Sequence, residues 1–187
     1  NKLDIEENTN QGYWITFYSN KNQTPGLYKA EVTVEAEGDE PIKIPVEVTV
    51  WDFAVPEEHS FDAPYGGTGG SVPYEETYEY LLRYRINAYN IPNISGRDSD
   101  EEAAKKTAEY IETHPGVSCF RADRYTKGYF DALEKYGVLD KCFTYPYDEP
   151  ADTVEMNKKV SDTFASYHAL NPNVKNMITT ASRETMF

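Results

Sequence analysis

The segment KCFTYPYDEP, residues 141–150, decides how the second half of this chain is interpreted. Its first part is apolar and aromatic, which predicts a buried strand, and Pro150 marks the point where that strand gives way to a loop. Two adjacent carboxyl groups, Asp148 and Glu149, stand at this end. In a dry pocket both could not ionise easily, so one would keep its proton more readily than the other. The pair is therefore the candidate catalytic centre.

Strands and helices alternate on both sides of this segment. Capping boxes, Ser99 with Glu102 and Asp152 with Glu155, predict two helix starts. This alternation predicts right-handed βαβ units and a parallel sheet with its helices outside. The expected strands lie near residues 60–64, 87–91, 117–122, 141–147 and 174–180.

A doubly wound sheet and an interrupted (β/α)8 barrel of the TIM type both fit this order. The barrel is favoured because polar residues follow successive strands: Asn90, then Arg121 and Asp123, then the acidic pair. Barrel enzymes build their sites from the carboxyl ends of several strands. The glycine-rich segment 66–70 lacks the G-x-G-x-x-G spacing of a nucleotide site, so a mobile loop over the barrel mouth is the favoured interpretation.

The first 55 residues have a different period. Segments 27–36 and 42–50 alternate apolar and polar residues, and segment 13–18 is a third candidate strand. The sequence therefore predicts an α/β protein in two parts. Residues 1–55 are the last strands of a small antiparallel β-sandwich, and residues 56–187 are the first part of an incomplete (β/α)8 barrel.

Composition excludes several classes of partner. The net charge is −14, from 18 Lys and Arg against 32 Asp and Glu, and a surface that binds nucleic acid or an anionic membrane needs a basic patch. No apolar run reaches the roughly 20 residues that cross a bilayer. The two cysteines are predicted to be buried thiols, and the three histidines have no metal-ligand spacing, so neither a metal nor another cofactor is expected. The 16 tyrosines suit a sugar-binding cleft or a half-buried core equally well.

Three motifs together resemble glycoside hydrolase family 123. They are VTVWDF at residues 48–53, YRINAY at 84–89 and YDEP at 147–150. The resemblance spans nearly the whole chain and implies a β-N-acetylgalactosaminidase-like enzyme with Asp148 and Glu149 as its catalytic pair. The departure from the family is one of extent, because a complete barrel has three more strands than are predicted here. The chain by itself is therefore expected to have little or no catalytic activity.

The expected function is retaining, substrate-assisted hydrolysis of terminal β-linked N-acetylhexosamine, with N-acetylgalactosamine preferred by resemblance. The partner is then a glycan or glycoconjugate, and the expected location is secreted, periplasmic or cell-surface; the oligomeric state is not indicated. The alternative is a noncatalytic carbohydrate-binding or cell-surface module whose acidic pair only caps a helix. The residues expected to bind substrate, or alternatively to make ordinary surface contacts, are Tyr147, Arg121, Asn90 and Asp123.

Overall fold

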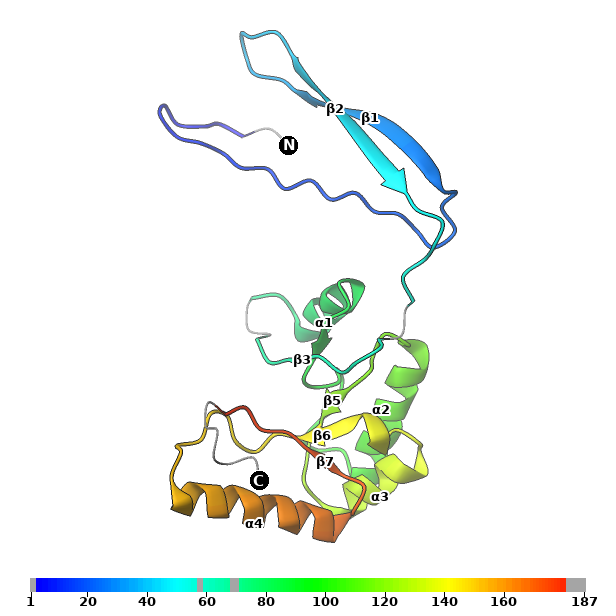
Figure 1. The fold of residues 1–187 in the computed structure, drawn as a ribbon, viewed down its shortest axis with the longest axis vertical. Coiled ribbons are helices and arrows are strands. Elements are labelled where there is room, and N and C mark those ends of the chain that lie inside the picture. Colours follow the sequence, from blue (N-terminus) through cyan, green and yellow to red (C-terminus); the bar gives the residue numbers. More distant parts are fainter. Residues whose placement is uncertain (1–2, 57–58, 68–70, 181–187) are drawn as a thin grey trace. The chain divides into compact units, whose positions relative to one another are not determined.

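The computed structural model describes residues 3–56, 59–67 and 71–180, and the chain divides into two compact units, Asn1–Pro56 and Glu57–Phe187. The first unit holds strands β1 (Gly26–Val34) and β2 (Ile42–Val50). The second alternates short strands with helices (Figure 1). Its elements are β3 (Pro64–Tyr65), α1 (Tyr74–Arg83), β4 (Asn87–Ala88), α2 (Asp100–Thr113), β5 (Phe120–Arg121), α3 (Lys127–Lys135), the short 3-10 helix η1 (Leu139–Lys141), β6 (Cys142–Thr144), α4 (Val154–Leu170) and β7 (Lys175–Asn176).

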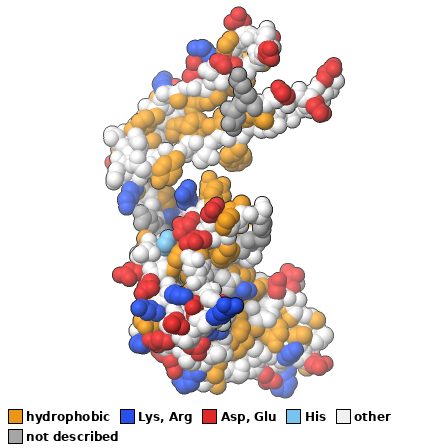
Figure 2. Space-filling view, turned by 180° about the vertical axis from the view of Figure 1, so that it is seen from behind, with side chains coloured by type: hydrophobic (Ala, Val, Ile, Leu, Met, Phe, Trp, Pro, Cys, Tyr) orange, Lys and Arg blue, Asp and Glu red, His pale blue; other side chains and the backbone are white. Residues whose placement is uncertain are grey.

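The first unit is an antiparallel ribbon with two unlike faces. Its register runs from Gly26 opposite Val50 to Val34 opposite Ile42. Because side chains alternate along a strand, Tyr28, Ala30, Val32 and Val34 of β1 share one face with Ile42, Ile44, Val46 and Val48 of β2. The other face carries two cross-strand ion pairs, Lys29 with Glu47 at 2.7 Å and Lys43 with Glu31 at 3.0 Å. Figure 2 shows hydrophobic side chains gathered at the surface of this unit.

The predicted β-sandwich is wrong. Residues 3–25 form no strand, so segment 13–18 does not add to the ribbon, and the Trp14 side chain is 94% exposed. The ribbon is a two-stranded sheet and the described part of the first unit contains no second layer. Alternation alone predicts which face of a strand is apolar, but it does not supply the layer that would cover this face.

The predicted barrel is also wrong, although the parallel pairing on which it was based is present. β3 pairs with β4 in parallel, and β5, β6 and β7 form a parallel three-stranded sheet in sequence order. Each register extends over only two residue pairs before the chain leaves the ladder. A barrel needs strands long enough to tilt and to stagger their hydrogen bonds around a closed ring. The described part of the second unit is instead a small mixed α/β domain with four α-helices and short sheets.

A compact core between the helices and the short sheets holds the second unit together. α2 and α3 pack against each other (Figure 1), and the side chains of Phe120, Phe130 and Leu133 are almost completely buried. The capping box predicted at the start of α2 is confirmed, since Ser99 accepts from the Glu102 amide while Glu102 accepts from the Ser99 amide. Burial of these aromatic and aliphatic groups is the main stabilising contribution to the unit.

Candidate functional site

The acidic pair lies just beyond the carboxyl end of β6, against the segment that follows β7. Asp148 forms an isolated parallel bridge with Thr179. The Glu149 amide donates to the Thr179 carbonyl at 3.1 Å and to its hydroxyl at 3.3 Å. The backbone that carries both carboxyl groups is therefore attached to a segment 30 residues further along the chain.

Two hydroxyl groups hold the Asp148 carboxylate. Its Oδ1 accepts from the Tyr145 hydroxyl at 2.6 Å and from the Thr179 hydroxyl at 2.7 Å. These hydrogen bonds, with Tyr145 the larger cause, hold the pKa of Asp148 below its usual value, so the group is a carboxylate at neutral pH. Among the described residues Oδ2 has no hydrogen-bond partner. This oxygen is free to accept a hydrogen bond from a ligand.

Tyr145 remains a proton donor at neutral pH. Its removal from water and its hydrogen bond to Asp148 raise the pKa of Tyr145 to about 12. The tyrosine hydroxyl also lies 2.7 Å from the Thr179 hydroxyl, so the three groups form a closed triangle. In this triangle the Asp148 Oδ1 is the acceptor, and the two hydroxyl groups hold the negatively charged carboxylate in one orientation.

Glu149 has a backbone conformation that breaks the alternation of a strand. Its φ is +43°, in the left-handed region that few residues other than glycine adopt. In a regular strand, neighbouring side chains point to opposite faces. Because Glu149 has this left-handed conformation, the side chains of Asp148 and Glu149 need not point to opposite faces. Both carboxyl groups are exposed to solvent.

The acidic pair does not cap α4. The helix begins at Val154, and its N-cap is Thr153, whose hydroxyl accepts from the Met156 amide at 3.1 Å. The capping box predicted for Asp152 is therefore wrong by one residue, because Thr153 takes the cap position. Asp148 and Glu149 lie upstream of the cap, so the cap proposed for them in the noncatalytic alternative is not formed.

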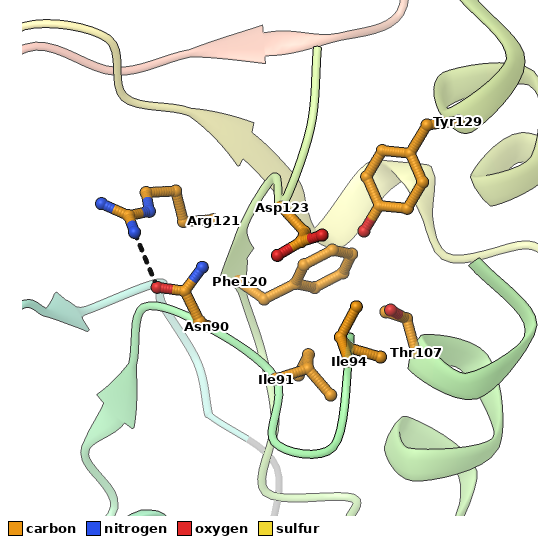
Figure 3. A pocket seen from close by; sticks show the side chains of 8 residues that line it. All are labelled: Asn90, Ile91, Ile94, Thr107, Phe120, Arg121, Asp123 and Tyr129. Carbon is orange, nitrogen blue, oxygen red and sulfur yellow. Dashed lines mark hydrogen bonds between the residues drawn. The ribbon is translucent and has the colours of Figure 1, made fainter. Parts of the chain in front are cut away.

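Three of the four residues predicted to bind substrate line one pocket (Figure 3). They are Asn90, Arg121 and Asp123, and the Arg121 Nη2 donates to the Asn90 Oδ1 at 2.8 Å. Their side chains come from the loop after β4 and from β5 and the loop after it. The rest of the lining is Ile91, Ile94, Thr107, Phe120 and Tyr129.

Two tyrosines connect this pocket with Asp148. The Arg121 guanidinium lies 5.4 Å from the centre of the Tyr89 ring, and the Tyr89 ring lies edge-on to the Tyr145 ring at 5.4 Å. Tyr145 then donates to Asp148. Tyr89, Tyr145 and Thr179 were not predicted as site residues, yet each lies in or just after an expected strand. Their sequence positions are the signal that could have found them.

Tyr147 points elsewhere. Its hydroxyl lies 3.1 Å from the Thr163 hydroxyl on α4, and the Lys159 ammonium lies 5.9 Å from the centre of its ring. It is not among the residues that line the pocket. The structure therefore gathers Asn90, Arg121 and Asp123, relates them to Asp148 through aromatic contacts, and attaches Tyr147 to a helix.

Comparison with protein families and with curated proteins finds no match. No protein-family model matches the chain, and no curated protein matches it significantly. The resemblance to glycoside hydrolase family 123 therefore rests on the sequence motifs alone. Within residues 3–56, 59–67 and 71–180, no His, Cys, Asp and Glu side chains form a group that could hold a metal ion. Over the same residues, no helix is long and apolar enough to span a membrane.

Proposed function

We propose that this chain carries the catalytic carboxyl groups of a glycosidase that removes terminal β-linked N-acetylhexosamine with retention of configuration. The observation that carries the proposal is the Asp148 carboxylate, whose Oδ1 is held by Tyr145 and Thr179 and whose Oδ2 has no partner within residues 3–56, 59–67 and 71–180. Beside it is a second carboxyl group, Glu149, on a backbone that breaks strand alternation. N-Acetylgalactosamine is the favoured sugar because of the resemblance to family 123.

In the proposed reaction the substrate supplies its own nucleophile. The acetamido oxygen attacks the anomeric carbon, the glycosidic carbon–oxygen bond breaks, and Glu149 gives its proton to the departing oxygen. Water then attacks the anomeric carbon of the oxazolinium ion and returns a proton to Glu149. Two displacements at one carbon retain its configuration.

Asp148 acts on the acetamido group in this scheme. Its free Oδ2 accepts the acetamido N–H and stabilises the positive charge that develops on the ring. Tyr145 and Thr179 are positioning residues, because their hydrogen bonds to Oδ1 orient the carboxylate and keep it ionised. Asn90, Arg121 and Asp123, beyond Tyr89 and Tyr145, provide polar groups for other parts of the glycan.

The test is the binding of an N-acetylgalactosamine-derived thiazoline, a stable analogue of the bicyclic intermediate, measured by calorimetry. We expect Asp148→Asn to weaken this binding about tenfold or more, since it removes a charge-assisted hydrogen bond. The matched control is Asp152→Asn, which makes the same change of charge at an exposed residue nearby. Equal binding by the parent chain and Asp148→Asn would overturn the proposal.

Hydrolysis distinguishes the roles of the two carboxyl groups. Because both are exposed to water, where electrostatic stabilisation is weak, we expect the 187-residue chain to turn over slowly or not at all. Where turnover is measurable, Glu149→Gln should spare aryl substrates whose leaving group needs no proton, and Asp148→Asn should slow every substrate.

A noncatalytic carbohydrate-binding module is the second candidate, and the exposure of both carboxyl groups favours it. Such a module would bind N-acetylgalactosamine itself as tightly as the thiazoline, because it has no reason to recognise a reaction intermediate. A thiazoline affinity well above that of the sugar favours the enzyme.

A further inference from the structure

The guanidinium group of Arg121 is held in place from two sides. The Asn90 Oδ1 accepts from Nη2 at 2.8 Å, and the Tyr89 ring lies 5.4 Å from the central carbon of the group. Gly66 packs close to the same ring, since a Cβ there would come within 2.8 Å of it. Asn90 uses one of the five N–H donors of the guanidinium. The side chain is thus fixed, while most of its donors have no partner in the part of the chain that the structure describes.

No carboxylate neutralises Arg121 among the described residues, although the chain has 32 acidic residues. Arg124, which follows three residues later, is the internal comparison. It pairs with Asp123 at 2.8 Å and Asp100 at 3.6 Å, and it donates to the Asp98 and Ser95 carbonyls. Arg124 is a structural residue whose charge is compensated. Arg121 is fixed by an amide and a ring, which leave its charge available.

Arg121 also lies on the side of the domain that carries the acidic pair. The Arg121 guanidinium lies over the Tyr89 ring, and the Tyr89 and Tyr145 rings meet edge to face. The Tyr145 hydroxyl in turn donates to Asp148. A sugar bound at Asp148 would therefore have Arg121 beyond a layer of tyrosine. The neighbouring Asp123 carboxylate is compensated by Arg124, so it opposes an incoming anion only weakly.

We propose that Arg121 is a subsite for an anionic substituent of the glycan, a carboxylate or a sulfate ester. The inference rests on the proposed function for the identity of the ligand as a sugar, and it adds that the preferred glycan is acidic. With a net charge of −14 the chain repels anions at long range, so selectivity for an acidic sugar needs a local cation. A guanidinium suits this purpose because its planar array of donors matches carboxylate and sulfate oxygens.

The experiment measures binding of monosaccharides to the whole chain by NMR titration. The probes are N-acetylgalactosamine, N-acetylgalactosamine 6-sulfate and galacturonic acid, so that the neutral sugar, the sulfate and the carboxylate are compared directly. We expect at least one acidic sugar to bind about tenfold more tightly than the neutral one. Equal affinity for all three would overturn the inference.

Two variants identify Arg121 as the cause. Arg121→Gln removes the charge, and Asn90→Asp supplies an internal carboxylate of the same size that occupies the guanidinium. Both should abolish the advantage of the acidic sugar. Lys105→Gln, on the exposed face of α2, changes the net charge equally and should retain it. An advantage that persists in both Arg121→Gln and Asn90→Asp contradicts the inference.

The result is independent of catalysis. If an acidic sugar binds selectively through Arg121 but thiazoline binding is unchanged by Asp148→Asn, the glycosidase proposal is rejected and the Arg121 subsite is supported. If thiazoline binding requires Asp148 but acidic sugars bind no more tightly than the neutral one, the glycosidase proposal is supported and the Arg121 subsite is rejected.

Discussion

The ribbon of β1 and β2 and the domain that begins at residue 57 use apolar residues in opposite ways. The ribbon exposes them: Ile42 and Ile44 remain 62% and 46% exposed. The domain buries them, and Phe130 and Leu133 are 0% exposed. Strand alternation is a local property and forms a two-faced ribbon without any neighbour. A core requires several elements that cover one another, so only the domain can draw most of its stability from burial.

The largest expected effect separates the two units directly. Phe130→Ala should lower the free energy of unfolding of the domain by about 3–5 kcal/mol, because it opens a cavity in the core. Ile44→Ala should change the stability of the ribbon by less than about 0.5 kcal/mol, because its side chain is already exposed.

Separate spectroscopic signals allow this measurement in one chain. The strands β1 and β2 lie in the first unit, and the α-helices of the described residues lie in the second. Denaturant unfolding followed by the NMR signals of the β1 and β2 amides therefore reports on the ribbon, and the helical far-ultraviolet circular dichroism signal reports on the domain. A shift of both signals by Phe130→Ala would show that the two units unfold together and would contradict the comparison.

A buried polar residue should produce the next largest effect. Asn87 is completely buried, accepts from the Ser118 amide at 2.9 Å, and lies 3.0 Å from the His59 ring nitrogen. Asn87→Ala should cost about 1–3 kcal/mol, since it leaves a polar group without its partner. The helical circular dichroism signal measures the loss. Asn173→Ala, at a more exposed residue, is the control, and an equal loss there would contradict the prediction.

A smaller effect concerns the charge state of Asp148. Tyr145→Phe removes its strongest donor, so the pKa of Asp148 should rise toward the ordinary value of about 3.9. The folded-state pKa is depressed in the parent chain. Its contribution to stability is therefore present above the unfolded-state pKa and is lost as the pH falls through the folded-state value.

An NMR titration of the Asp148 carboxyl carbon measures this change. Tyr147→Phe is the matched control, because it deletes a hydroxyl that faces Thr163 on α4. An unchanged Asp148 titration in Tyr145→Phe would remove the hydroxyl triangle from the description of the site.

The smallest effect is expected in the ribbon. Lys29 and Glu47 pair across the strands at 2.7 Å with both side chains largely exposed. A double-mutant cycle with Lys29→Ala and Glu47→Ala should give a coupling of about 0–1 kcal/mol, because solvent screens the pair. The NMR signals of the β1 and β2 amides report the stability of this unit. A coupling well above this range would mean that ion pairs, rather than the alternation pattern, stabilise the ribbon.

Prediction from the sequence succeeded where a feature depends on neighbouring residues. The start of α2 followed from Ser99 and Glu102, because a capping box is complete within four positions. The parallel pairing of β5 with β6 followed from the alternation of strands and helices. The length of the ladders did not follow, because the point at which a strand leaves its partner depends on how the loops pack. The barrel was wrong for this reason. The sandwich was wrong for another, since the β1–β2 ladder is long but no further strand or layer of the described residues joins it.

The candidate site shows the same division. The sequence by itself determined that Asp148 and Glu149 stand together after a strand and that Asn90, Arg121 and Asp123 follow neighbouring strands. Only the tertiary structure decided that Tyr145 and Thr179 hold Asp148, that Arg121 is fixed by Asn90 without a carboxylate from the described residues, and that Tyr147 turns to α4. Order along the chain determines which residues reach one edge of a sheet. The contacts of Asp148 with Thr179 and of Arg121 with Asn90 join segments 31 residues apart, which meet only when the domain folds.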